Sequence, residues 1–245
     1  MPQRGATFRV VGAKTGGFSP GWDLLDASGQ EWSAKAGPEA QSEVVASRPP
    51  TYHLAEWVLE GATDTPEPSR FRPKLPTMRR VGDWSWHRSP FVGTPELNGL
   101  LVLMRRVNNW DLLERNNAPY EVDEGSGTAH RYVVQDLGAA LGRAKVLGST
   151  SRNDVDDFET TAFTKGGDED NGHVRFDDIG RWHRELFRNI PPSHARWVCS
   201  KLDRLTDGQW LDAFRAGGYD GPTADRFIRR LRAKVAEGMA LPAVP

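Results

Sequence analysis

The pattern of apolar residues changes character once along the chain, and this change most constrains the fold. Up to about residue 61, apolar and polar residues alternate in short stretches such as FRVV and WDLLD, with glycine-rich or polar turns between them. Such alternation is typical of β-strands. From Pro95 onward, apolar residues recur at the spacing of helices. The sequence therefore predicts an α+β protein, with a small antiparallel sheet first and a mainly helical part after it.

Prolines indicate where the elements of the first part begin and end. Pro38 opens a run of helix formers that two further prolines end, which predicts one short helix over 38–48. The polar segment 63–76 holds four prolines and is predicted to be a connection. We place the lobe boundary there, with a β-rich N-lobe at 1–74 and a C-lobe at 75–245.

The second part contains a series of amphipathic segments. A helix is expected from about Leu97 to Val107, and a glycine-rich turn at 121–130 precedes a predicted strand over 131–138. Further helices are expected over 179–190, 193–205, 208–218 and 223–239.

Composition excludes several classes of protein. The formal net charge is −1, so a nucleic-acid partner is not expected. The single cysteine, Cys199, rules out an internal disulfide and a multi-thiolate zinc site. Neither an apolar run long enough to span a membrane nor a secretory signal is present in the sequence. We expect a cytoplasmic protein without a membrane partner.

Three side chains with oxygen atoms stand in an order that suits phosphoryl transfer. Asp111 is followed five residues later by Asn116, and Asp136 follows an apolar stretch predicted to be a strand. Phosphoryl transfer needs a carboxylate that orients the acceptor and oxygen ligands for Mg²⁺ at the phosphates. Carboxylate and amide oxygens suit magnesium better than zinc or copper.

These motifs resemble those of the protein-kinase-like superfamily. DLLERN (111–116) is similar to the catalytic-loop form D-x-K-x-x-N, and DLG (136–138) to the metal-binding triplet D-[FL]-G. Longer stretches, among them WSAKAGPEAQSEVVASR and YVVQDLGAALGR, resemble a bacterial group with kinase-like architecture. The resemblance to HipA-type and secretory-pathway kinases is limited to these short motifs and their order along the chain.

The resemblance implies ATP and Mg²⁺ as cofactors and a two-lobed fold. Asp111 would orient or deprotonate the acceptor, with Asn116 beside it, and Asn116 and Asp136 would bind the metal. Lys35 would contact the nucleoside triphosphate, held by a glutamate of the following helix. Glu43 is the first choice for that glutamate. Glu39 is the alternative.

Glycines before the second predicted strand indicate a phosphate-binding turn, but less specifically than the motifs at Asp111 and Asp136. Gly12, Gly16, Gly17 and Gly21 lie in or beside the predicted turn between the first two strands, where backbone amides can approach phosphates. We assign Gly16 and Gly17 to the phosphate-binding turn. The stretch fits neither the dinucleotide fingerprint nor the Walker pattern.

One departure from the family pattern weakens the expected activity. Leu113 stands where the family has a lysine that neutralises the transferring phosphoryl group, and Arg115 or Lys14 are the candidate substitutes. The sequence therefore predicts a kinase-like phosphotransferase, with a pseudokinase that binds a nucleotide or a partner as the alternative. The acceptor stays open among proteins, metabolites and sugars, and transfer of the nucleotide itself also remains an option.

A second alternative is a non-catalytic binding protein that uses its tryptophans. It requires Trp84 and Trp86 on the surface, whereas packing in the core is the favoured interpretation. The histidines show no paired metal-binding spacing, so His183 is expected to be an ordinary surface or packed residue.

Overall fold

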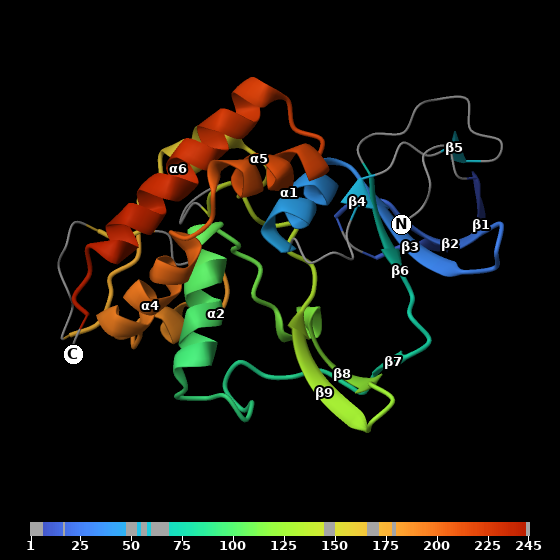
Figure 1. Cartoon of the computed structure of the whole chain (residues 1–245), viewed down its shortest axis with the longest axis horizontal. Helices are drawn as coiled ribbons and strands as arrows, with labels where there is room; N and C mark the ends of the chain where they lie inside the picture. The colour runs from blue at the N-terminus through green and yellow to red at the C-terminus, as the bar shows by residue number, and fades with distance from the viewer. Residues whose placement is uncertain are drawn as a thin grey trace.

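The computed structural model confirms the α+β class (Figure 1). It describes residues 7–16, 18–47, 53–54, 58–59, 69–144, 150–165, 172–177 and 180–243. Strands and one short helix come first, and helices follow. Along the longest axis of the molecule, the first sheet lies at one end and the long helices at the other.

The first sheet is a meander extended by later strands. Its order is β4-β6-β3-β2-β1-β5, and all pairings are antiparallel except the two-residue pairing of β1 with β5. The strands are β1 (Thr7–Lys14), β2 (Gly21–Asp26), β3 (Glu31–Ala36), β4 (His53–Leu54), β5 (Val58–Leu59) and β6 (Ser69–Pro73).

One face of this sheet builds its own small core. Phe8, Leu24, Trp32 and Phe71 come from four different strands and are each at most 6% exposed. Phe8 stacks on Phe71 at 5.1 Å and meets Trp32 edge-on at 6.0 Å. The alternation of apolar residues in the sequence thus places one large side chain per strand on the buried face.

Strand β6 corrects the prediction that 63–76 is only a connection. Its segment pairs with β3 so that Phe71 lies opposite Ala34. The sequence SRFRP alternates polar residues with one aromatic residue, and its proline stands at the end of the strand, where a missing N–H does least harm. Phe71 is fully buried, and this burial outweighs the weak local strand signal.

Helix α1 (Pro38–Ser47) follows β3 directly, as expected from Pro38. The predicted end at residue 48 lies outside the described residues. Glu39, Ser42 and Glu43 are buried, so α1 turns a polar face toward the protein interior. A helix with buried carboxylates needs cationic or hydrogen-bonding partners there, and these partners form the site described below.

The remaining elements build the helical part and a second sheet, β7-β8-β9. Thr94 caps α2 by accepting a hydrogen bond from the Leu97 N–H at 3.2 Å, and Pro95 occupies its first turn. None of the helices in the described ranges has the length and apolar character required to cross a bilayer. The elements are β7 (Met78–Arg80), α2 (Pro95–Arg106), η1 (Glu114–Asn116), β8 (Asn117–Asp123), β9 (Thr128–Val134), α3 (Val155–Glu159), η2 (Arg184–Phe187), α4 (Pro192–Leu202), α5 (Asp207–Ala216) and α6 (Gly221–Met239).

Two predicted elements have bounds that differ from the prediction. The helix over 179–190 is reduced, in the residues described, to the single 3₁₀ turn η2, because His183 before it has left-handed backbone angles. The strand predicted over 131–138 is instead β9 at Thr128–Val134, so it begins inside the turn predicted over 121–130, and Asp136 lies two residues beyond its end.

The helical core contains both tryptophans on which the glycan-binding alternative depends. Trp84 is 5% exposed and Trp86 is fully buried, and their ring centroids lie 4.6 Å apart. Their indole N–H groups donate to the carbonyl oxygens of Val133 and Leu112. The requirement that these tryptophans lie on the surface is therefore wrong.

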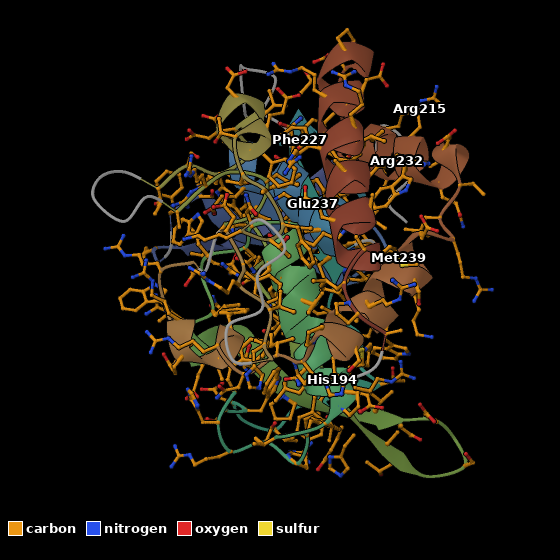
Figure 2. The ribbon with its side chains drawn as sticks, turned by 90° about the vertical axis from the view of Figure 1, so that its left-hand side faces the viewer. His194, Arg215, Phe227, Arg232, Glu237 and Met239 are labelled. Atoms are coloured by element: carbon orange, nitrogen blue, oxygen red, sulfur yellow. The ribbon has the colours of Figure 1, made fainter. Side chains whose placement is uncertain are left out.

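Helix α6 (Figure 2) contributes Val235 to this core and packs Phe227 and Leu231 into a second buried cluster. Phe227 is buried, and Arg232 points outward to Asp207. Lys234 is completely buried and donates to Asn108 Oδ1 at 2.7 Å and Thr161 Oγ1 at 3.0 Å. This buried lysine fixes the chain just before the loop that carries Asp111.

Candidate active site

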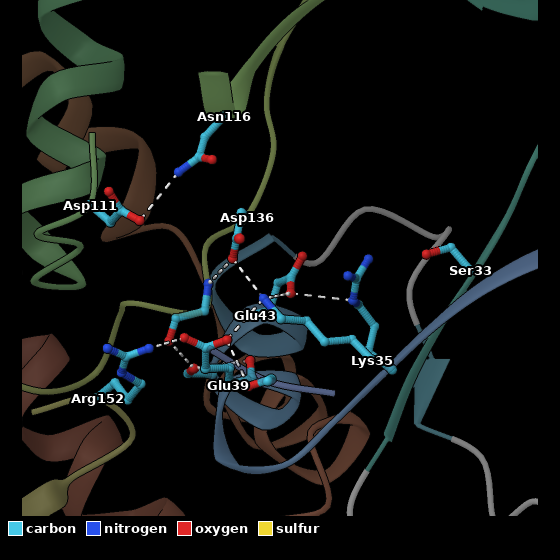
Figure 3. A network of polar contacts seen from close by, with 12 residues as sticks. Ser33, Lys35, Glu39, Glu43, Asp111, Asn116, Asp136 and Arg152 are labelled. Atoms are coloured by element: carbon cyan, nitrogen blue, oxygen red, sulfur yellow. Dashed lines mark hydrogen bonds and ion pairs between the residues drawn. The ribbon is translucent and has the colours of Figure 1, made fainter. Parts of the chain in front are cut away.

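The predicted lysine and the predicted metal-binding aspartate lie in contact. Lys35 Nζ, at the end of β3, lies 2.9 Å from Asp136 Oδ1 (Figure 3). The Lys35 side chain is only 13% exposed, whereas that of Asp136 is 46% exposed. A half-exposed carboxylate beside a nearly buried ammonium leaves Asp136 open to a ligand from solvent.

Both candidate glutamates of α1 reach Lys35. Nζ lies 3.0 Å from Glu39 Oε2 and 3.7 Å from Glu43 Oε2. The two glutamates are one helical turn apart, so they share a face of α1. Glu43 also lies 3.3 Å from the Arg70 side chain. Glu39 is thus the nearer partner of Lys35, and Glu43 bridges Lys35 and Arg70.

Close backbone packing positions Asp136 against α1. The Ser42 hydroxyl donates to the Gly138 carbonyl at 2.9 Å, and a Cβ on Gly138 would lie 2.8 Å from Cβ of Glu39. Only glycine permits this approach. Asp136 itself has a φ of 57°, a left-handed conformation that is uncommon for a residue with a side chain. The DLG segment is therefore held in an unusual conformation next to Lys35.

Asp111 and Asn116 form a pair beside this cluster. Asn116 Nδ2 donates to Asp111 Oδ2 at 3.4 Å, across the loop that ends in η1. In Figure 3, the carboxylate of Asp136 lies between this pair and the Lys35 ammonium. The other Asp111 oxygen, Oδ1, is buried and has no hydrogen-bond partner within the described part of the chain. A buried carboxylate oxygen without a hydrogen bond is costly to keep ionised.

The pKa shifts follow from this crowding of charge. Burial raises the pKa of the Asp111 carboxyl, and the charge of Asp136 raises it further. Burial also works against ionisation of Asp136, but the charge and hydrogen bond of Lys35 bring its pKa below the ordinary value. Burial alone would lower the pKa of Lys35, yet the charges of Glu43, Asp136 and Glu39 raise it. Burial raises the pKa of Glu43 in spite of Arg70. The pKa values of the two aspartates are thus shifted in opposite directions, Asp111 upward and Asp136 downward.

Sequence reasoning missed Arg152. Its guanidinium forms an ion pair with Glu39 Oε1 and lies 3.8 Å from the ring centroid of Phe18 and 5.0 Å from that of Trp110. Glu39 in addition accepts a hydrogen bond from the Ser19 hydroxyl at 2.7 Å. Arg152 therefore joins the turn between β1 and β2 to the helical part. No local motif marks it, because all these partners are distant in sequence.

The remaining predicted positions have less direct placements. A Cβ added at Gly16 would meet no atom within 4 Å, so its environment does not demand glycine, and Gly17 lies outside the described residues. Lys14 donates to Ser33 Oγ at 2.7 Å and pairs with Asp23, which directs it away from the role of a substitute for Leu113. The charge of Arg115 lowers the pKa of Asp111 as a smaller effect.

A mostly apolar pocket of about 710 Å³ is lined by residues of α1, α2 and α5, among others. Its lining includes Ala46, Leu103, Val134 and Trp210. Leu137 also lines it, directly after Asp136 in the sequence. The polar cluster around Lys35 is separate from this pocket.

Comparison with known proteins gives structural neighbours only. No family model and no curated protein matches the chain. Among solved structures, a proinflammatory kinase of Helicobacter pylori, CtkA, is 10% identical, with 98% of each chain covered and a TM-score of 0.46. The Rio2 kinase of Chaetomium thermophilum, solved as a complex with ADP/Mg²⁺ and phosphoaspartate, is 12% identical. That comparison covers 93% of this chain and 70% of the other, with a TM-score of 0.34.

Proposed function

We propose that the chain is an ATP- and Mg²⁺-dependent phosphotransferase of the kinase-like superfamily, with an N-lobe at 1–74 and a C-lobe at 75–245. The observation that carries this proposal is the contact between Lys35 of the sheet and Asp136 of the DLG segment, with Asp111 and Asn116 beside it. These residues occupy separate parts of the sequence. Phosphoryl transfer needs a cation at the phosphates, ligands for a metal ion and a carboxylate that orients the acceptor, and these residues bring such groups together.

The residues fit the proposed cofactors. Asp136 Oδ2 and Asn116 Oδ1 have no hydrogen-bond partner in the described ranges, and both are oxygen donors of the kind Mg²⁺ prefers. Asn116 and Asp136 would hold the metal, which supplies positive charge to the phosphates of a bound ATP. The hydrogen bond from Asn116 to Asp111 ties this metal site to the proposed base.

Lys35 is suited to hold phosphates. Three carboxylates surround its ammonium, so it stays protonated, and a positive charge fixed in this way loses little freedom when a phosphate binds. The proposed phosphate-binding turn holds Gly16 and Gly17, and the hydrogen bond of Ser19, two residues after Gly17 in the sequence, to Glu39 supports this role.

Asp111 is suited to act on the acceptor. Its raised pKa makes it a better proton acceptor than an ordinary exposed aspartate. Asn116 holds its oxygen Oδ2 and so fixes the orientation of the carboxylate. Asp111 would accept the proton of the attacking hydroxyl.

A second function is nucleotide binding without transfer. The specific observation in its favour is Leu113, an apolar residue at the start of η1 where the resembling family has a lysine. The Arg152 ion pair with Glu39 supplies a cation near the cluster, but from a different segment. Binding would then depend on Lys35 and Asp136, while Asp111 would be dispensable.

Turnover of labelled ATP tests the proposal without a known acceptor. Both hydrolysis and self-labelling of the protein should be measured for the wild type and for Asp111→Ala. We expect turnover to fall by about 10²- to 10⁴-fold, or about 3 to 5 kcal/mol of barrier, with nucleotide binding retained. The exposed Asp225→Ala is the matched control. Equal turnover by wild type and Asp111→Ala would remove Asp111 from its role.

A further inference from the structure

A second cluster of ligand-type side chains lies outside the proposed active site. It consists of His87, His183 and Glu185, whose ligand atoms all lie within 4.8 Å of one another. His87 Nε2 is 3.2 Å from His183 Nδ1. Glu185 Oε1 is 3.2 Å from the former nitrogen and 3.4 Å from the latter. One oxygen and two ring nitrogens therefore form a nearly equilateral triangle.

The size of this triangle matches one face of a tetrahedral metal site. Zinc binds imidazole nitrogen and carboxylate oxygen at about 2.0 to 2.2 Å. In a regular tetrahedron with bonds of about 2.05 Å, neighbouring ligand atoms are about 3.3 Å apart. The three measured distances, 3.2, 3.2 and 3.4 Å, fall around this value.

Protons alone do not satisfy all three contacts. If one of the two facing nitrogens carries a proton, the other directs its lone pair toward the Glu185 carboxylate. If both carry protons, both N–H groups donate to Glu185 Oε1, and the two ring nitrogens then lie 3.2 Å apart without a hydrogen bond between them. A divalent cation placed among the three atoms accepts a lone pair from each of them.

The backbone at His183 supports a ligand role. Its φ and ψ of 51° and 41° are left-handed, a conformation that side-chain-bearing residues populate sparsely. This turn places His183 and Glu185 on the same side, where both face His87. His87 lies 96 positions before His183 in the sequence. Residues in such conformations cluster at sites where geometry matters more than local stability.

We propose that His87, His183 and Glu185 bind one Zn²⁺ ion, with water as the fourth ligand. Two imidazoles and one carboxylate suit zinc, whereas Mg²⁺ prefers oxygen ligands. The three side chains are 42%, 25% and 56% exposed, so an ion can enter from solvent. This site uses none of the residues of the proposed phosphotransfer.

The bound ion would connect two segments that support the Asp111 loop. Before His87, the Ser85 hydroxyl donates to Glu114, and the Trp86 indole donates to the Leu112 carbonyl at 2.8 Å. Before His183, the Arg181 N–H donates to the Trp110 carbonyl at 3.4 Å. Zinc would therefore cross-link both supports of this loop and raise the melting temperature of the protein.

Titration of chelator-treated, metal-free protein with Zn²⁺ tests this site. We expect one Zn²⁺ per chain, measured by calorimetry and by competition with a chromophoric chelator. His87→Ala and Glu185→Gln should each weaken binding at least tenfold and abolish the rise in melting temperature. His130→Ala, an exposed histidine on β9, is the matched control and should bind like the wild type. Bound Co²⁺ should show the absorption of a tetrahedral site.

Two results would overturn the proposal. One is the absence of stoichiometric Zn²⁺ binding by the wild type. The other is a Zn²⁺ affinity of His87→Ala and His183→Ala equal to that of the control His130→Ala. Circular dichroism checks that each variant is folded. Asp136→Asn should keep its zinc affinity, so failure of the zinc site and failure of the phosphotransfer proposal are distinguishable.

Discussion

Lys35 Nζ and Asp136 Oδ1 lie 2.9 Å apart, although 101 residues separate them in the sequence. This contact joins the first sheet to the segment after β9. Because Glu39 and Glu43 also lie within 4 Å of the same ammonium, one cation holds three carboxylates together. In the proposed active site, the Lys35 ammonium thus contacts all three carboxylates, while Arg152 pairs with Glu39 and Arg70 with Glu43.

Removal of that charge should destabilise the protein. In Lys35→Met, the carboxylates of Glu39, Glu43 and Asp136 lose a shared cation in a mostly buried place. Loss of one partner from a buried ion pair costs about 3 to 5 kcal/mol. Urea unfolding should show a decrease of this order, and the exposed Lys165→Met should show almost none. Equal unfolding free energies for both variants would contradict the central role of Lys35.

Asp111→Asn should remove transfer activity but stabilise the fold at neutral pH. The pKa of Asp111 is higher in the folded than in the unfolded protein, so its ionised form weakens the fold. This penalty is complete above the folded pKa and disappears as the pH falls toward the ordinary value of 3.8. The difference in unfolding free energy between variant and wild type should therefore shrink on acidification. A variant less stable than the wild type at neutral pH would contradict this sign.

Gly138→Ala should disturb both stability and nucleotide affinity. The added Cβ would lie 2.8 Å from Cβ of Glu39, so α1 would have to move away from the DLG segment. Overpacking of this kind costs about 1 to 3 kcal/mol. Gly208→Ala is the control for a glycine-to-alanine change in an open place, because the nearest atom to its added Cβ would be 3.9 Å away. If the two variants unfold alike, the close packing at Gly138 is unimportant.

Leu113→Lys should increase phosphate transfer. A lysine at this position would restore the cation that the resembling family places near the transferring group, and we expect a gain of roughly tenfold, or about 1.4 kcal/mol of barrier. Labelled ATP turnover measures it. Leu75→Lys, at an exposed position, is a control for the added charge alone. Retained nucleotide binding without any gain in transfer would favour the binding module over the enzyme.

Strong local signals made much of the fold predictable. Pro38 and the helix formers behind it indicated α1, and the alternation around Phe8, Leu24 and Trp32 indicated the meander. Strand β6 was not predictable, because its arginines and the prolines in and around it resemble a connection and only the burial of Phe71 selects a strand. The helix expected over 179–190 failed for the opposite reason: its apolar pattern is helical, but the backbone at His183 is not.

The site was predictable only in part. The spacing of Asp111 and Asn116 and the DLG triplet pointed to side chains that the fold brings near Lys35, but no spacing distinguishes Glu39 from Glu43, which share a helix face. Arg152 and the pair of His87 with His183 depend on contacts between distant segments, which a single sequence does not encode locally. Such partners emerge only when the chain is folded.

The most direct test of the central claim is the effect of ATP on thermal stability, with and without Mg²⁺, in the wild type and in Asp136→Asn. A ligand at a hundred times its dissociation constant adds about 2.7 kcal/mol, which corresponds to about 5 to 10 °C in melting temperature for a chain of this size. We predict this increase for the wild type with Mg²⁺, and its loss when Mg²⁺ is omitted or Asp136 is replaced. An unchanged melting temperature in the wild type, or an equal increase in Asp136→Asn, would contradict the claim that Asp136 is part of a magnesium–nucleotide site.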